Sequence, residues 1–130
     1  MEIRNIESVP VFITKDTSEI RELLAYRNSS ITNQSLAEAT IPVGAKTIAH
    51  LHRKTEEIYY ITAGVGNMTI ESETSQVNVG DAIAIPPGKI HQIENCGDVP
   101  LKLLCCCSPC YEHDDTVLYD DSGNPIQDEA

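Results

Sequence analysis

The amino-acid sequence predicts an all-β domain, folded as a sandwich or as a closed barrel. Short runs rich in Ile, Val, Thr and Tyr recur at intervals of about 8–12 residues, a spacing typical of such folds. Turn-forming residues, including seven Gly and seven Pro, separate the runs. With 130 residues, the chain is long enough for a single domain with its own apolar core.

One short helix is expected ahead of the strands. Asp16 and Glu19 have the spacing of a helix-capping box, in which side chains satisfy backbone N–H groups at the start of a helix. Apolar residues then recur at helical spacing, from Ile20 to Leu24. This pattern predicts a helix of at most about three turns over residues 17–27.

The rest of the chain is expected to form strands that end at turn signals. The clearest signals are Gly64-Val65-Gly66, Gly80-Asp81 and Pro86-Pro87-Gly88. The expected strands cover residues 35–41, 47–52, 57–62, 67–71, 76–79, 82–85, 91–94 and 101–107. An antiparallel sheet of this size often closes into a barrel, which removes its exposed edges.

The negative charge of the chain is concentrated at its C-terminal end. The sequence has 20 acidic and 9 basic residues, a formal net charge of −11. Residues 112–130 hold seven of the acidic residues and neither Lys nor Arg, which leaves 13 acidic and 9 basic residues elsewhere. We therefore expect one domain over residues 1–116 and an acidic, partly flexible tail over residues 117–130. The balance argues against nucleic acid and membrane surfaces as partners, since both bind clustered positive charge.

Three features of the sequence indicate in which cellular compartment the protein is located. No run approaches the roughly eighteen apolar residues of a membrane span. The first ten residues lack the basic and then apolar pattern of a signal peptide. The five cysteines are odd in number and three are adjacent, at residues 105–107, unlike the spaced cysteines of a secreted disulfide framework. A cytoplasmic protein is expected.

Three of the four histidines suggest a metal site. His50 and His52 stand two positions apart on an expected strand, so that both imidazoles project to the same face. A carboxylate follows after the next turn, at Glu56 or Glu57, and His91 begins a later strand. Three imidazoles and one carboxylate form a ligand set suited to a divalent first-row transition metal.

Two motifs in this region resemble those of the cupin superfamily. The first, G-x5-H-x-H-x3,4-E-x6-G, is matched by Gly44, His50, His52, Glu57 and Gly64. The second, G-x5-P-x-G-x2-H-x3-N, is matched by Gly80, Pro86, Gly88, His91 and Asn95. The resemblance implies a cupin jelly-roll β-barrel (double-stranded β-helix) of the small, single-domain type-2 group. It also implies metal ligation by His50, His52, Glu57 and His91, since only Glu57, and not Glu56, leaves six residues before Gly64.

The resemblance leaves several activities open, because cupins with these four ligands include dioxygenases, decarboxylases and sugar isomerases. One divalent transition metal, Fe, Mn, Ni or Zn, is implied as cofactor. A metal-dependent, dioxygenase-type oxidoreductase acting on a small molecule is favoured, because four protein ligands leave coordination sites open. A sugar-phosphate isomerase, similar to mannose-6-phosphate isomerases, is the alternative. A non-enzymatic cupin that binds a sugar or another small molecule is a third.

Candidates for contact with a substrate are Gln34, Tyr59 and Ile93. Tyr59 shares a strand face with Glu57, and Ile93 shares one with His91. A sugar-phosphate isomerase would also need basic residues near the metal to bind phosphate. The basic residues available, none of them on the expected ligand face, are Arg27, Lys46, Arg53, Lys54 and Lys89. A homodimer is expected, as is common among single-domain cupins, and outward-facing Ile58 and Tyr60 are consistent with it.

The cysteines near the C-terminus allow two interpretations. Cys107 and Cys110 have the CxxC spacing of a zinc or redox pair, although zinc sites usually need a second pair. Packing of residues 105–107 as small apolar residues of the last strand is favoured instead. Residues 107–116 also resemble a C-S-P-P-Y-x-H-E-D-T tail of some small cupins, and His113 within it is expected at the surface.

Overall fold

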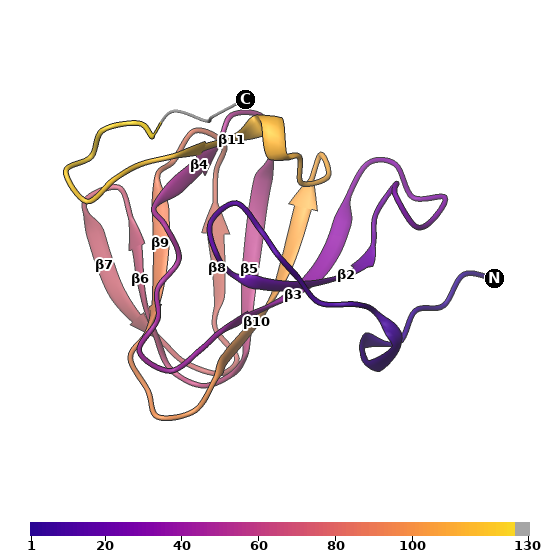
Figure 1. Cartoon of the computed structure of the whole chain (residues 1–130), viewed down its shortest axis with the longest axis horizontal. Helices are drawn as coiled ribbons and strands as arrows, with labels where there is room; N and C mark the ends of the chain where they lie inside the picture. The colour runs from indigo at the N-terminus through magenta and orange to yellow at the C-terminus, as the bar shows by residue number, and fades with distance from the viewer. Residues whose placement is uncertain (127–130) are drawn as a thin grey trace.

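The computed structural model describes residues 1–126 and consists of two antiparallel sheets that face each other (Figure 1). The six-stranded sheet has the order β1 (Phe12–Ile13), β2 (Glu19–Leu24), β3 (Ser35–Ile41), β10 (Leu101–Ser108), β5 (Glu56–Ala63) and β8 (Ala82–Ile85). The five-stranded sheet has the order β11 (Thr116–Leu118), β4 (His50–His52), β9 (His91–Asn95), β6 (Gly66–Ile70) and β7 (Glu73–Val77). The predicted all-β barrel is thereby confirmed.

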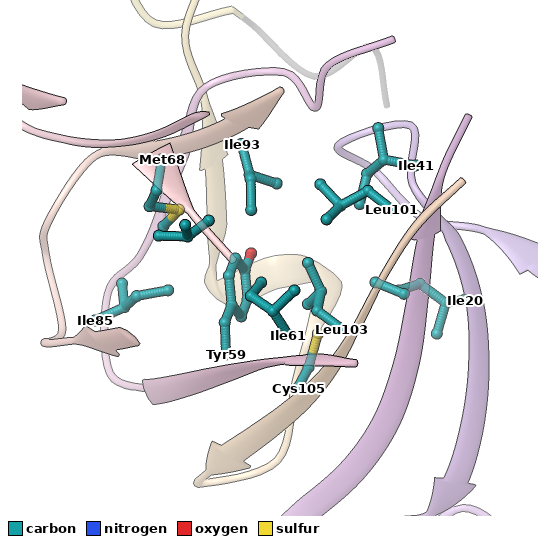
Figure 2. Close-up of a cluster of buried hydrophobic side chains, with 12 residues drawn as sticks. Ile20, Ile41, Tyr59, Ile61, Met68, Ile85, Ile93, Leu101, Leu103 and Cys105 are labelled. Carbon is teal, nitrogen blue, oxygen red and sulfur yellow. The ribbon is translucent and has the colours of Figure 1, made fainter. Parts of the chain in front are cut away.

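The apolar core fills the space between the two sheets (Figure 2). Tyr59, Ile61 and Leu103 enter it from the six-stranded sheet, and Met68 and Ile93 from the five-stranded sheet. In β5 and β10 buried and exposed residues alternate, because successive side chains of a strand point to opposite faces. The inward positions of these two strands continue from the core into the candidate site.

The predicted helix over residues 17–27 is wrong, because residues 19–24 form β2. Ile20 is buried and pairs with Ala39 of β3, so backbone hydrogen bonds to a neighbouring strand replace those of a helix. Thr17 has a φ of 76°, which turns the chain sharply before β2. A helix of this length is marginal by itself, so pairing with β3 outweighs the local helical pattern. Within residues 1–126 the helical turns are two short 3-10 segments, Ile6–Ser8 and His113–Asp115.

The last strand, β11, spans the predicted boundary between domain and tail at residues 116 and 117. It pairs with β4, with Thr116 opposite His52 and Leu118 opposite His50. Beyond it, the backbone N–H of Tyr119 donates to the carbonyl of Ala49. The end of the predicted tail, residues 127–130, lies outside the described residues. Within residues 1–126 no helix is long and apolar enough to cross a membrane.

Candidate metal centre

The predicted ligands come from three strands that the fold brings together at one end of the core. His50 and His52 lie on β4, His91 begins β9, and Glu57 lies near the start of β5. His50 and His91 are direct partners in the antiparallel pairing of β4 and β9, and their ring centroids are 4.2 Å apart. All four side chains are buried.

The three histidines form a cluster that could hold a metal ion. One nitrogen of each ring lies within 4.8 Å of those of the other two. The strand alternation explains the arrangement, because His50 and His52 point inward while Leu51 between them is only half-buried.

Glu57 adds a carboxylate to this cluster. Its Oε1 lies 3.4 Å from Nε2 of His52 and 3.4 Å from Nε2 of His91. Its neighbour Glu56 is exposed and points to the other face of β5. The structure therefore brings Glu57, and not Glu56, into contact with the histidines.

The hydrogen bonds of two histidines fix which ring nitrogen carries the proton. Nδ1 of His50 lies 2.7 Å from the carbonyl of Ile48, and Nδ1 of His91 lies 3.0 Å from the carbonyl of Lys89. Because a carbonyl only accepts, Nδ1 is the donor in both rings. In the neutral rings, the lone pairs of both Nε2 atoms therefore point into the site, as metal-ligating histidines require.

His52 reaches the same tautomer through a hydroxyl. Its Nδ1 lies 3.0 Å from Oγ1 of Thr116. Thr116 donates its own hydroxyl hydrogen to the carbonyl of Glu112, at 3.0 Å, so its oxygen is left to accept from His52. The lone pair on Nε2 of a neutral His52 ring then faces Glu57.

Two buried atoms of the cluster have no hydrogen-bond partner, Oε1 of Glu57 and Nε2 of His91. They face each other at 3.4 Å, and in the tautomer just described both offer lone pairs. Unpaired buried polar atoms are costly, so a proton or a cation is needed between them. Imidazole nitrogens with a carboxylate oxygen are donors that divalent first-row metals accept, so the residues present fit such an ion.

The charges of the cluster follow from burial and proximity. Burial acts to raise the pKa of Glu57, but hydrogen bonds and charge from His52 and His91 rings that carry a proton on Nε2 outweigh it and hold the pKa well below its usual range. Burial, with the neighbouring His91 acting in the same direction, lowers the pKa of His50 to about 4, although Asp16 opposes the shift. At neutral pH Glu57 is therefore anionic and His50 is neutral, the forms in which a carboxylate and an imidazole can bind a metal.

Cys107 orients Glu57 from the other side. Its thiol donates to Oε2 of Glu57 over 3.3 Å. Burial and the negative charge of Glu57 raise the pKa of Cys107, which keeps this thiol protonated. The carboxylate is thus held by Oε2 while Oε1 faces the histidines.

A cavity opens above the cluster and runs into the barrel. Its volume is about 50 Å³. Tyr59 and Ile93, two of the predicted substrate contacts, line it. The third, Gln34, is exposed and is not among the lining residues. The opposite face of β3 lines the cavity instead, through Ser35, Ala37, Ala39 and Ile41.

Three lining residues that contact the histidines, Asp16, Tyr111 and Thr116, were not anticipated as site residues. The sequence pattern predicts a helix cap at Asp16, but its Oδ2 lies 3.3 Å from Nε2 of His50. The ring of Tyr111 stands edge-on to His52, with centroids 5.8 Å apart. Tyr111 and Thr116 both belong to the tail pattern at residues 107–116, which could have signalled them. His113 of that pattern is exposed and is not among the lining residues.

All five cysteines are free thiols. Cys105 and Cys107 point into the cavity, and Cys106 between them is exposed. Cys110 is buried, and its thiol donates to the carbonyl of Gln34 at 3.0 Å. The CxxC pair therefore forms no disulfide, and within residues 1–126 the three-histidine cluster is the metal-ligand group that the structure brings together.

Comparison with known proteins decides the family. The family model described as "Cupin domain" matches residues 37–107, a segment that contains all four predicted ligands. The chain belongs to the cupin family. An uncharacterised protein of Methanocaldococcus jannaschii is 52% identical over 112 residues, which are 86% of this cupin and 90% of that protein.

Other similarities are more distant. A mannose-1-phosphate guanylyltransferase of Salmonella typhimurium is 32% identical over 79 residues, which are 61% of this cupin but only 16% of the transferase. Among solved structures, a protein described as a predicted oxalate decarboxylase from Thermotoga maritima superposes with a TM-score of 0.74 at 23% identity, covering 83% of this cupin and 99% of that chain. The oxalate decarboxylase of Bacillus subtilis gives 0.75 at 21% identity, over 90% of this cupin and 32% of that chain. These structural similarities establish the jelly-roll fold of the cupin family.

Proposed function

We propose that this cupin binds one divalent transition metal through His50, His52, His91 and Glu57, and transforms a small molecule in the adjoining cavity. The observation that carries the proposal is the buried pair of unpartnered atoms, Oε1 of Glu57 and Nε2 of His91, which face each other at 3.4 Å. A cation between them would satisfy both atoms at once. The Nδ1 hydrogen bonds of the three rings already orient them for it.

The favoured reaction class is oxidation of the dioxygenase type. A bound Fe, Mn, Ni or Zn ion would supply Lewis acidity, and Fe(II) in an open site would supply reactivity toward dioxygen. The residues of the chain bind and enclose the substrate. Apolar side chains such as Ile41, Ile93 and Leu103 exclude water from the cavity, while Tyr59 offers a phenol to an oxygen of the substrate.

A sugar-phosphate isomerase is the second candidate. The similarity to part of the mannose-1-phosphate guanylyltransferases, which are named for a sugar phosphate, favours a sugar phosphate as ligand. The cavity favours oxidation instead, because its lining within residues 1–126 includes neither Lys nor Arg to bind a phosphate. Arg53 and Lys54 line a separate surface cleft with Glu112 and Asp115. Binding of a small molecule without turnover would point to the third candidate, a non-enzymatic binding protein.

The metal itself provides the test. We expect about one divalent transition metal per chain in the purified protein, measured by elemental analysis. His91→Ala and Glu57→Gln should each reduce this occupancy at least about tenfold, because each removes one ligand. The matched control is His113→Ala, which removes an exposed histidine and should leave occupancy unchanged. Wild-type protein that takes up no stoichiometric metal would overturn the proposal, as would variants with unchanged occupancy. Oxygen uptake with candidate substrates then tests the reaction class.

We also propose that the protein is a homodimer that acts in the cytoplasm. Five free thiols suit a reducing compartment. The exposed apolar side chains of Ile58 and Tyr60 on β5 offer a surface for a second copy.

A further inference from the structure

A second carboxylate reaches the histidine cluster from outside both cupin motifs. Asp16 lies in the turn between β1 and β2, and its Oδ2 is 3.3 Å from Nε2 of His50. Its side chain is only 13% exposed and lines the cavity. Glu57 contacts His52 and His91, so the two carboxylates approach different histidines of one cluster.

The two carboxylate oxygens of Asp16 have different partners. Oδ1 accepts from the hydroxyl of Thr14 at 2.6 Å, and from the hydroxyl and backbone N–H of Ser18 at 2.6 and 3.0 Å. Those bonds fix the carboxylate plane and leave Oδ2 directed at His50. A group that served only to close the turn would not need to place its second oxygen on a buried imidazole.

In the neutral form of His50, no hydrogen lies between its Nε2 and Oδ2 of Asp16. Nδ1 of His50 donates to the carbonyl of Ile48, so Nε2 of the neutral ring has a lone pair that faces the lone pairs of Oδ2. Adjacent ligands on one ion with bonds of about 2.1 Å lie about 3.0–3.4 Å apart. The 3.3 Å separation of Oδ2 from Nε2 therefore suits two groups that face one cation.

The charges around such a cation would balance. Two carboxylates, Asp16 and Glu57, would offset the two positive charges of a divalent ion, where Glu57 alone would leave one. A third lining carboxylate, Glu22, is paired with Arg27 at 2.9 Å. Within residues 1–126 neither Lys nor Arg lines the cavity. An incoming anion would therefore be attracted only weakly to the metal centre, whereas the affinity of an uncharged molecule would not depend on this charge balance.

We propose that Asp16 is a second anionic group of the metal centre, and that it makes the cavity select uncharged small molecules over carboxylates and phosphates. This inference rests on the metal centre proposed above. The ligands it predicts are uncharged hydroxy or carbonyl compounds with an apolar face, which the walls formed by Ile41, Ile93 and Leu103 would cover.

The test compares an anion with a neutral molecule at the same centre. The protein is loaded with Co(II), and its visible absorption is followed during titration with azide or with imidazole. Asp16→Asn keeps an oxygen to accept from Thr14 and Ser18 but removes the charge. We expect it to bind azide at least about tenfold more tightly than wild type, with imidazole affinity changed less than about threefold, since a unit charge about 5 Å from a partly buried anion is worth more than a tenfold step.

Two further variants make the result specific. Asp98→Asn removes the same charge from an exposed position outside the cavity lining, and should change neither affinity. Asp16→Ser retains an acceptor for the turn with a shorter side chain, and should reproduce the gain in azide affinity. Thermal melting of the metal-free proteins checks that each variant is folded.

The outcomes separate this inference from the proposed function. If wild-type protein binds one Co(II) but Asp16→Asn and Asp16→Ser leave azide affinity unchanged, the role of Asp16 is overturned and the metal centre stands. If wild-type protein does not bind Co(II) at one per chain, the proposed function fails and this inference fails with it. Equal gains for azide and imidazole would also overturn it, because they would show an effect of access and not of charge.

Discussion

Each histidine of the cluster is held by its Nδ1 and faces the site with its Nε2. For His50 and His91 the acceptor is a backbone carbonyl, which no substitution removes. For His52 the acceptor is the side chain of Thr116, on a different strand. Thr116 is therefore the contact through which ring orientation can be changed without altering a ligand.

Thr116→Val is expected to weaken metal binding at least about tenfold, because an outer partner of a ligating histidine fixes its tautomer and direction. The valine would fill the same space but leave Nδ1 of His52 and the carbonyl of Glu112 without their hydroxyl partner. Thr116→Ser keeps the hydroxyl and serves as the control, with affinity within about threefold of wild type. Competition with a chromogenic chelator measures both, and equal affinities for the Val and Ser variants would contradict the role of Thr116.

The residues of the site differ in how far the sequence predicts them. Spacing to Gly64 favours Glu57 over Glu56, and the burial of Glu57 agrees with that choice. Asp16 could not be predicted, because its contact with His50 depends on how the β1–β2 turn folds onto β4, 34 positions further along the chain. Its local pattern also suits a helix cap, and nothing in the neighbouring sequence argues against that interpretation.

At the level of strands and turns, prediction succeeds where the local sequence bounds an element. The strands β3 and β8 have the expected bounds, and each is followed directly by Pro, at Pro42 and Pro86. The strands β1 and β11 are two and three residues long, too short to show an alternating pattern. Each forms a strand because it pairs with another strand, β1 with β2 and β11 with β4. Since β4 is remote from β11 in the sequence, the local sequence pattern does not predict that pairing.

Two glycines in turns, Gly64 and Gly80, can be compared to distinguish the cost of backbone strain from the cost of steric crowding. Gly64 and Gly80 have φ values of 85° and 93°, so an added side chain strains both. A Cβ at Gly64 would also lie 3.0 Å from the backbone of Pro100 and Leu101, while one at Gly80 meets nothing within 4 Å. The turn after β5 therefore packs directly against the start of β10.

Gly64→Ala is expected to destabilise the protein more than Gly80→Ala. Strain alone should cost about 1–2 kcal/mol in each variant. At Gly64 the backbone of the β10 start must also shift, which we expect to add at least about 1 kcal/mol. Urea unfolding of the metal-free proteins measures the difference through the transition midpoints. Equal losses for the two variants would contradict the close approach of this turn to β10.

On the scale of the whole molecule, the six-stranded sheet has apolar residues on both faces. Its inner face forms the core and the cavity. On its outer face, Ile58 of β5 pairs with Cys106 of β10 on one side and Ala84 of β8 on the other. Tyr60 has Leu104 and Ala82 as its corresponding neighbours. A three-strand apolar surface of this kind is typical of a face that packs against another layer.

We therefore expect the proposed homodimer to use this outer face, and Ile58→Asp to separate it. Light scattering after size exclusion should give about twice the 14.3 kDa chain mass for wild type and a single chain mass for the variant. Ile58 is 50% exposed and points away from the core, so a charge there should leave the barrel folded, as circular dichroism would show. The control Ser75→Asp places the same charge on exposed β7 of the other sheet and should remain dimeric. If Ile58→Asp remains dimeric, the two copies must meet through another surface. The second copy would then not be what covers the apolar outer face.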